Sequence, residues 1–168
     1  MEIGSVGIVG AGLMGSGIAE VCARNGIRTL VTEAGPEQLA AGQRRVNASL
    51  ERGRETGKLS DEDVERINGL LTFTPRLEDF AECDFCVEAI VEQLPAKVSI
   101  FQRLDHIVSE NTILSTNTSA LPIIEIARAT RRPGANSLAC AHRTYAIEGS
   151  GRAASRARAG RSRPGSPG

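Results

Sequence analysis

Hydrophobic residues along this chain gather in short apolar runs, separated by longer segments in which they recur every three or four positions. A short apolar run bounded by turn residues is typical of a buried strand, and the spacing of three to four is typical of a helix. Five runs predict strands, at 5–9, 27–33, 70–75, 84–90 and 112–119.

Capping residues delimit the helices predicted between these strands. Gly26 is placed to end the first helix, since glycine adopts the left-handed conformation that closes many helices. Pro36 and Pro122 stand in the first turns of later helices, and Ser60 precedes a group of acids, as a helix-capping serine often does. The predicted helices cover 13–26, 35–57, 60–68, 95–110 and 121–130.

The alternation of strands and helices predicts the α/β fold class, with a doubly wound, mostly parallel sheet. In such a sheet, ligands bind in the crevice outside the carboxyl ends of the strands. The polar residues that directly follow each strand are therefore the candidates for a functional site.

Length and composition fit one ordinary domain. The chain has 168 residues, of which 40% are hydrophobic, enough for a core. No apolar run approaches the roughly 20 residues that a membrane span needs, and the N-terminus lacks the basic and apolar regions of a signal peptide. We therefore predict a cytoplasmic protein with no membrane segment.

Cys83 and Cys86 form a C-x-x-C pair, a spacing found in some zinc and redox sites. No second pair lies near it, and a structural zinc ion needs about four ligands. We favour the alternative that small, partly buried residues share this spacing by chance, and we predict no metal.

The formal net charge of zero hides a division of the chain. Residues 1–130 carry 12 basic and 19 acidic residues, whereas residues 131–168 carry eight arginines and a single acid, Glu148. The end of the chain also lacks hydrophobic periodicity, so we predict a domain at 1–133 and a disordered basic tail at 134–168. Such arginines allow nonspecific contact with nucleic acid, but no aromatic residues are interleaved with them, and we predict no nucleic-acid function.

The segment "GAGLMG" follows the first strand and opens the first helix. In a G-x-G-x-x-G motif the first glycine allows a tight turn, the second lets a pyrophosphate approach the backbone, and the third lets the helix pack closely on the strand. The free N–H groups of the helix N-terminus favour a phosphate there. We predict a dinucleotide site at Gly10, Ala11, Gly12, Leu13, Met14 and Gly15; the alternative is a glycine-rich turn without a ligand.

Glu33 follows the second strand, 18 residues after Gly15. A carboxylate at this place can accept hydrogen bonds from the adenosine ribose hydroxyls and would repel a 2′-phosphate, which favours NAD over NADP. The alternative is a solvated acid.

Two further groups of polar residues follow the fourth and fifth strands. Glu88, Glu92 and Lys97 are placed to hold the nicotinamide ribose or a substrate, or else to form a surface ion pair. Asn117, Thr118 and Ser119 form a polar turn that enters a helix. Capping of that helix is the simpler interpretation, and a hydrogen bond from a hydroxyl to a substrate oxygen is the alternative.

Together these stretches resemble the 3-hydroxyacyl-CoA dehydrogenase family, particularly its bacterial 3-hydroxybutyryl-CoA dehydrogenases. The stretches that carry the resemblance are "VGIVGAGLMGSGIAE", "LERGRETGKLS", "LTFTPRLEDF", "VEAIVEQLPAKVSIFQRLD" and "ILSTNTSALPI", within residues 3–133. The resemblance implies a Rossmann-type NAD-binding domain with a helical-hairpin insertion. It also implies a C-terminal helical domain that usually forms a homodimer, and we expect that domain to be absent here.

The resemblance also implies roles for individual residues. Gly10 to Gly15 match the dinucleotide loop, and Glu33 matches the ribose acid. Glu92, Lys97 and Asn117 match contacts on the nicotinamide side. Ser119 matches the active-site serine that hydrogen-bonds the 3-oxygen of the substrate, and Ser49 matches a serine near bound coenzyme A.

The reaction that the resemblance implies is the reversible, NAD-dependent oxidation of the 3-hydroxyl of an acyl-CoA in fatty-acid or butanoate metabolism. It needs a base for the hydroxyl proton, and the family uses a histidine in an "HFFNP" strand 21 residues after the serine. A His–carboxylate pair suits that role. Here position 140 is Cys140, and His142 stands two residues late in "CAHRTY".

The stretch after Pro133 prompts a hypothesis about the reading frame. The family commonly continues "RRP" with "ERIA" or a similar stretch, and codons for Glu-Arg-Ile-Ala read one base early can spell the Gly-Ala-Asn-Ser found at 134–137. We expect a shift of frame near Pro133 and impaired catalysis in this chain. Two functions therefore stay open: a 3-hydroxyacyl-CoA dehydrogenase, and an inactive NAD-binding module.

Overall fold

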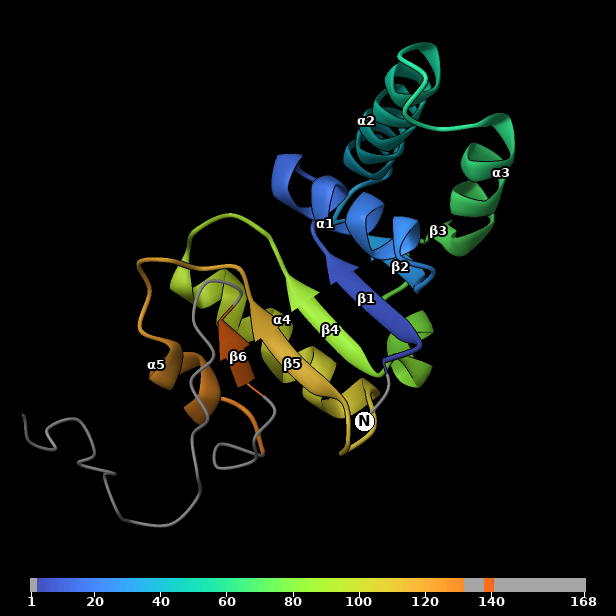
Figure 1. The fold of residues 1–168 in the computed structure, drawn as a ribbon. Coiled ribbons are helices and arrows are strands. Elements are labelled where there is room, and N and C mark those ends of the chain that lie inside the picture. Colours follow the sequence, from blue (N-terminus) through green and yellow to red (C-terminus); the bar gives the residue numbers. More distant parts are fainter. Residues whose placement is uncertain (1–2, 132–137, 141–168) are drawn as a thin grey trace, which may run out of the picture.

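A parallel sheet of six strands organises the chain, in the order β3-β2-β1-β4-β5-β6 (Figure 1). The structure is a computed structural model that describes residues 3–131 and 138–140. The strands are β1 (Ser5–Val9), β2 (Arg28–Thr32), β3 (Leu71–Phe73), β4 (Phe85–Glu88), β5 (Ile113–Thr116) and β6 (Leu138–Cys140). All neighbouring strands run parallel, so their carboxyl ends share one edge of the sheet.

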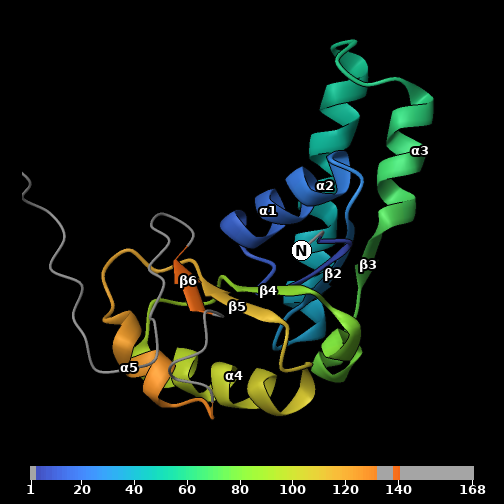
Figure 2. The same ribbon diagram turned by 60° about the horizontal axis from the view of Figure 1, so that its bottom comes forward.

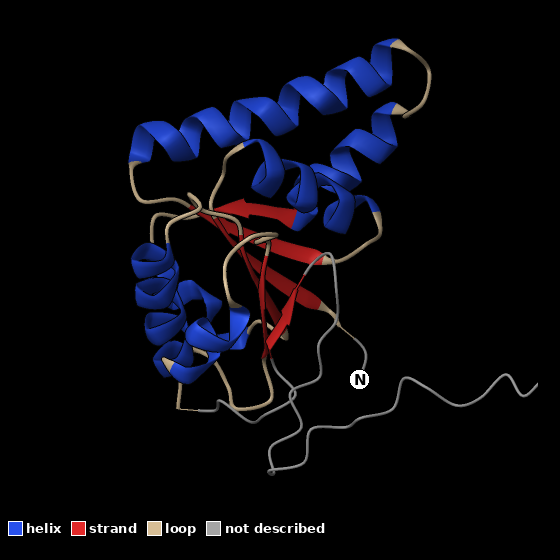
Figure 3. Ribbon diagram, turned by 90° about the vertical axis from the view of Figure 1, so that its left-hand side faces the viewer, coloured by secondary structure: helices blue, strands red, loops and turns tan. Residues whose placement is uncertain are grey.

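Helices cover both faces of the sheet (Figure 3). One face carries α1 (Leu13–Arg24), α2 (Pro36–Glu55) and α3 (Asp61–Leu70), and the other carries the 3₁₀ helix η1 (Leu77–Glu82), α4 (Leu94–Ile107) and α5 (Ile123–Arg128). Apolar clusters fill the space on each side: Ile8, Ala19 and Val31 under α1, and Phe80, Phe101 and Leu104 under α4. The fold is therefore the doubly wound α/β sheet that the sequence predicts.

The order of the strands reverses between β1 and β4. The chain passes from β1 outward to β2 and β3, then returns to the other side of β1 and continues outward through β4, β5 and β6. In open α/β sheets the crevice for a ligand forms at such a switch point, where the loops that leave two neighbouring strands diverge. The loops after β1 and β4 therefore frame the candidate site.

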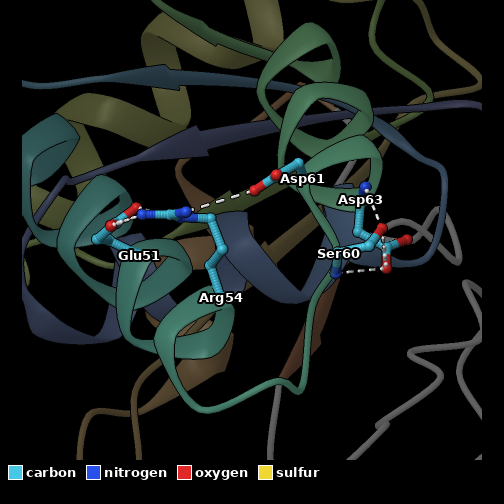
Figure 4. A network of polar contacts seen from close by, with 5 residues as sticks. All are labelled: Glu51, Arg54, Ser60, Asp61 and Asp63. Carbon is cyan, nitrogen blue, oxygen red and sulfur yellow. Dashed lines mark hydrogen bonds and ion pairs between the residues drawn. The ribbon is translucent and has the colours of Figure 1, made fainter.

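Helices α2 and α3 form a hairpin that projects beyond the sheet (Figure 2). Helix α2 buries Leu39, Gly42, Val46, Leu50 and Gly53, whose spacing of three and four residues forms one stripe. At the tip, Arg54 pairs with Glu51 on its own helix and with Asp61 of α3 at 3.5 Å (Figure 4). Ser60 and Asp63 form a reciprocal capping box that begins α3. This hairpin is the predicted helical insertion.

The predicted strands and helices agree with the structure apart from small shifts in their ends. Gly26, with φ of +81°, follows the end of α1, Pro36 opens α2, and Pro122 directly precedes α5. Helix α3 ends at Leu70, two residues later than predicted. The sequence analysis did not predict η1, a short 3₁₀ segment whose buried residues are only Leu77 and Phe80.

Strand β6 requires a correction. We expected residues 134–168 to form a disordered tail, but residues 138–140 pair in parallel with β5, with Leu138 opposite Leu114 and Cys140 opposite Thr116. Without this strand, β5 would present unpaired backbone groups at the edge of the sheet. A run of three residues is too short for its periodicity to reveal a strand. The rest of the predicted tail, with His142, lies outside the described residues.

Candidate functional site

A cleft of about 660 Å³ lies at the carboxyl edge of the sheet, across the switch point between β1 and β4. Its walls come from the loops after β1, β2 and β4, from the start of η1 and from one side of α4. Residues lining it include Gly12, Glu33, Ala34, Ile90, Val91 and Ile100. Three of the four loops with candidate residues, those after β1, β2 and β4, thus contribute to the cleft, whereas its lining among the described residues includes none from the loop after β5.

The glycine loop has the geometry that the motif predicts. Gly10 has φ of +107°, a conformation that side chains rarely adopt, and Gly15 packs so closely that a Cβ there would overlap the Gly10 carbonyl oxygen. Gly12 directly precedes α1, and a Cβ there would meet no atom within 4 Å. Two glycines are therefore required by the fold itself, whereas Gly12 keeps the space in front of the helix N-terminus open.

Glu33 joins this loop to the end of β2. Its carboxylate accepts hydrogen bonds from the Ala11 N–H at 2.9 Å and the Ala34 N–H at 2.8 Å. Its side chain is half-buried and lines the cleft. Because each carboxylate oxygen can accept more than one hydrogen bond, Glu33 still has capacity for hydroxyl groups of a ligand.

Arg45 of α2 supports the same loop from the helical side. Its guanidinium donates a hydrogen bond to the Ala11 carbonyl at 3.0 Å, and Gly42, one turn earlier, packs directly against Ala11. Neither residue was expected at the site from the sequence, because contacts between α2 and this loop depend on how the hairpin folds back. The signal that could have indicated this contact is Gly42, a small residue in the middle of the long amphipathic helix α2.

Glu88, at the end of β4, and Lys97, of α4, form a buried ion pair. Both side chains are 0% exposed, and the Lys97 Nζ lies 2.6 Å from Glu88 Oε1. The same ammonium lies 3.2 Å from Glu92 Oε2. Lys97 therefore lies behind Glu92, and its pair with Glu88 is buried, so this is not the surface ion pair that was one of the two alternatives; contact of this group with a ligand stays a prediction.

Glu92 is the member of this group that reaches solvent, with 43% of its side chain exposed. It accepts a hydrogen bond from the Thr118 hydroxyl, so it bridges the loop after β4 to the loop after β5. That hydrogen bond, and then the Lys97 ammonium, hold the pKa of the Glu92 carboxyl below its usual value. Glu92 is consequently ionised at neutral pH.

Asn117, Thr118 and Ser119 leave the carboxyl end of β5 on the same edge of the sheet. The Asn117 N–H donates to the Glu88 carbonyl at 2.8 Å, which continues the pairing of β4 with β5. Thr118 is buried, and its hydroxyl accepts a hydrogen bond from the Leu121 N–H at 3.1 Å, whereas Ser119 is exposed. The helix cap favoured for this segment is not formed, because Pro122 is the N-cap of α5 and no side chain caps it; the Thr118 hydroxyl instead closes the turn before that helix.

Ser49 lies apart from these residues. It lines a groove of about 280 Å³ between α1 and α2, together with Leu13, Arg45 and Arg52. Leu13 also flanks the glycine loop, since it is the first residue of α1, and its side chain is 81% exposed. The groove therefore begins beside the cleft and continues along the helical hairpin.

The remaining predictions of the sequence analysis concern features away from the cleft. Cys83 and Cys86 are both buried in the apolar cluster under α4. Within the described part of the chain, no three histidine, cysteine or acidic side chains group closely enough to hold a metal ion. The helices described here are all too short or too polar to cross a membrane.

Residues 5–143 match the family described as 3-hydroxyacyl-CoA dehydrogenase, NAD binding domain. A 3-hydroxybutyryl-CoA dehydrogenase of Mycobacterium tuberculosis is 44% identical over 129 residues, which are 76% of this chain and 45% of that protein. A probable 3-hydroxybutyryl-CoA dehydrogenase of Bacillus subtilis is 40% identical over 133 residues, 79% of this chain and 46% of that protein. The chain thus spans less than half the length of these relatives.

A solved structure shows the same architecture. The crystal structure of FadB2 from M. tuberculosis superposes with a TM-score of 0.79 at 42% identity, over 82% of this chain and 48% of that one. The match to the family extends through β6, which agrees with a sheet that continues past residue 133. The chain therefore belongs to the 3-hydroxyacyl-CoA dehydrogenase family, whose NAD-binding domain it contains.

Proposed function

We propose that the cleft at the carboxyl edge of the sheet binds NAD(H) through Gly10, Ala11, Gly12, Leu13, Met14, Gly15 and Glu33. The observation that carries this proposal is the geometry of the glycine loop: Gly10 and Gly15 are packed tightly, while the space at Gly12 is open at the start of α1. A pyrophosphate can approach the backbone there and accept hydrogen bonds from free N–H groups. Glu33, fixed by two backbone N–H groups, is placed for the adenosine ribose.

A variant of Gly12 tests cofactor binding. A Cβ at Gly12 meets no atom within 4 Å, so we expect Gly12→Val to keep the fold while the affinity for NADH falls at least about tenfold. Gly17→Val is the matched control, because a Cβ at Gly17 also meets nothing within 4 Å but lies on the exposed side of α1. Calorimetric titration with NADH measures both; equal affinities in the two variants would contradict the proposal.

We further propose that the reaction served by this site is the oxidation of the 3-hydroxyl of an acyl-CoA. NAD supplies the acceptor for the hydride when bound. Ser119 is exposed in the loop after β5 and would donate a hydrogen bond to the 3-oxygen, while Asn117 lies in the same loop and Glu92 in the loop after β4. The relatives named as 3-hydroxybutyryl-CoA dehydrogenases support this substrate class, and the groove at Ser49 is the proposed place for part of coenzyme A. The predicted homodimer and cytoplasmic location stay predictions.

The general base for the hydroxyl proton is the group that this chain is least suited to supply. β6 ends at Cys140, opposite Thr116, so by the resemblance a cysteine occupies the strand position that the family's histidine takes. A thiol is a poor general base for an alcohol proton at neutral pH compared with an imidazole oriented by a carboxylate. We therefore propose a second function as the alternative: an NAD-binding module with negligible turnover.

An activity assay distinguishes the two functions. We expect the 168-residue chain to show no oxidation of NADH that depends on acetoacetyl-CoA, although it binds NADH. Robust oxidation that is lost in a His142→Ala variant would establish the dehydrogenase and make His142 its base. The chain without acetoacetyl-CoA serves as the background measurement.

A further inference from the structure

Glu88, the last residue of β4, carries a buried carboxylate directly before Ala89 and Ile90, which line the cleft. We propose that Glu88 is a positioning residue: it holds Lys97, and through Lys97 it holds Glu92, on the side of the sheet's carboxyl edge that receives the nicotinamide half of the dinucleotide. The proposal rests on the NAD-binding function proposed above and extends it to a residue that does not itself reach the ligand.

Glu88 is fixed in place by contacts from three directions. Its Oε1 accepts hydrogen bonds from the Ile90 N–H at 2.7 Å and from Lys97 at 2.6 Å, and its Oε2 accepts one from the Thr116 hydroxyl at 2.7 Å. Its backbone belongs to the centre of the sheet, paired with Val9 on one side and Thr116 on the other. A carboxylate held in this way has a single orientation available to it.

Lys97 occupies a place that its own helix disfavours. It is the fourth residue of α4, where the partial positive charge of the helix N-terminus repels a cation. It is also 0% exposed, although burial of a charge costs free energy unless the charge is paired and hydrogen-bonded. The pair with Glu88 therefore decides where the ammonium lies.

Stability alone does not explain this pair. A buried ion pair is often no more stabilising than well-packed apolar residues of similar volume. The pair lies directly under Glu92, whose half-exposed carboxylate contacts Lys97 and the Thr118 hydroxyl together. What the pair provides is a fixed position for Glu92 and a link between the loops after β4 and β5.

The topology indicates which half of the dinucleotide this group faces. A dinucleotide lies across the switch point, with its pyrophosphate at the N-terminus of the first helix. Glu33, at the end of β2, lies on the side of the adenosine ribose. Glu92 and Thr118 follow β4 and β5, on the opposite side of β1, where the nicotinamide half must lie.

A comparison of two ligands tests this role. Glu88→Gln keeps the shape of the side chain but removes its charge, so Lys97 retains only Glu92 as an anionic partner. We expect the Kd for NADH to rise about tenfold, the usual scale for a hydrogen bond to a charged group, while the Kd for ADP-ribose, which lacks nicotinamide, changes less than twofold. Titration of the whole 168-residue chain with each ligand measures both values.

Two variants of Thr116 supply a test by conservative rescue. Thr116→Val removes the hydroxyl that donates a hydrogen bond to Glu88 Oε2. We expect it to raise the Kd for NADH by about threefold while the Kd for ADP-ribose stays unchanged. Thr116→Ser keeps the hydroxyl and should restore the affinity. Glu110→Gln, an exposed acid just before β5 at the other edge of the sheet, is the control for loss of one negative charge.

The possible outcomes separate the two proposals. Absence of NADH binding by the unsubstituted chain would overturn the proposed function, and the positioning role with it. If Glu88→Gln weakens the binding of NADH and of ADP-ribose equally, or weakens the binding of neither, the positioning role alone is overturned. Should Glu88→Gln unfold, the double variant Glu88→Gln, Lys97→Met leaves no unpaired buried charge and carries the same comparison of ligands.

Discussion

At the scale of single residues, the glycines of the loop after β1 have separate functions. Gly15 is needed by the fold, because a Cβ at this residue would overlap the Gly10 carbonyl oxygen. Gly12 and Gly17 have open space around them, so the fold itself tolerates a side chain there. A motif that looks uniform in the sequence therefore combines packing with ligand access.

Substitution of Gly15 should reveal this difference as a loss of stability. We expect Gly15→Ala to lower the free energy of unfolding by about 3 kcal/mol, because the loop must move away from α1 to admit the methyl group. Gly17→Ala should raise it by about 0.5–1 kcal/mol, the usual gain from replacing glycine inside a helix. Urea denaturation followed by circular dichroism measures both, and similar midpoints would contradict the assignment.

The carboxyl of Glu92 leads to a prediction about how the stability of the fold depends on pH. Its pKa lies below its ordinary value of 4.5, because the Thr118 hydroxyl and then Lys97 favour the charged form. A carboxyl whose pKa is lowered by folding contributes stability above its unfolded pKa and loses that contribution as the pH falls through its folded pKa. Glu92 should therefore support the fold near neutral pH and lose that contribution progressively as the pH falls below about 4.5.

Removal of the Thr118 hydroxyl tests whether this group causes the lowered pKa of Glu92. Thr118→Val should raise the pKa of Glu92 toward 4.5, and Thr118→Ser should leave it low. A carbon-detected NMR titration of the glutamate carboxyl groups follows the change directly. An unchanged pKa in Thr118→Val would assign the shift to Lys97 instead.

At the scale of elements, η1 packs against β1 with almost no space between them. A Cβ on Gly7 of β1 would lie 2.5 Å from the Phe80 ring, and Phe80 itself is fully buried. This contact explains how a short 3₁₀ segment with two buried side chains stays attached to the sheet. It also brings the start of η1, which lines the cleft, into a defined position.

Paired substitutions measure this contact. Gly7→Ala should lower the free energy of unfolding by about 1–3 kcal/mol through overpacking, and Phe80→Leu should lower it by a similar amount through loss of packing. The double variant should be more stable than the sum of the two losses implies, because the smaller side chain makes room for the methyl group. Additive losses in thermal unfolding would show that the two residues do not share this space.

At the scale of the whole molecule, the sheet extends across the predicted boundary at residue 133. Strand β6 adds a parallel neighbour to β5 and places Cys140 in line with Thr116, Glu88 and Val9. The family match ends at residue 143, three residues beyond this strand. Residues 144–168 contribute five of the eight arginines found in 131–168, but no pattern that predicts a core.

Shortened chains test where the folded unit ends. A chain of residues 1–143 should unfold at the same urea concentration as the full chain, because the sheet is intact. A chain of residues 1–133 lacks β6, and we expect it to lose about 2–3 kcal/mol, the scale of a few backbone hydrogen bonds. Equal stability of the two shortened chains would restore the boundary at 133.

The sequence by itself determined the order of strands and helices, the glycine loop, the place of Glu33 directly after the second strand, and the family. These features can be predicted from the sequence because they depend on local spacing: apolar runs, caps, and glycines at fixed intervals. Only the tertiary structure decided that Lys97 is buried behind Glu92, that Glu88 and Thr116 anchor it, that Gly7 receives Phe80, and that residues 138–140 join the sheet. Each of these depends on residues that lie far apart along the chain or on strands too short to show a period, and burial and pairing across a sheet are properties of the folded chain alone.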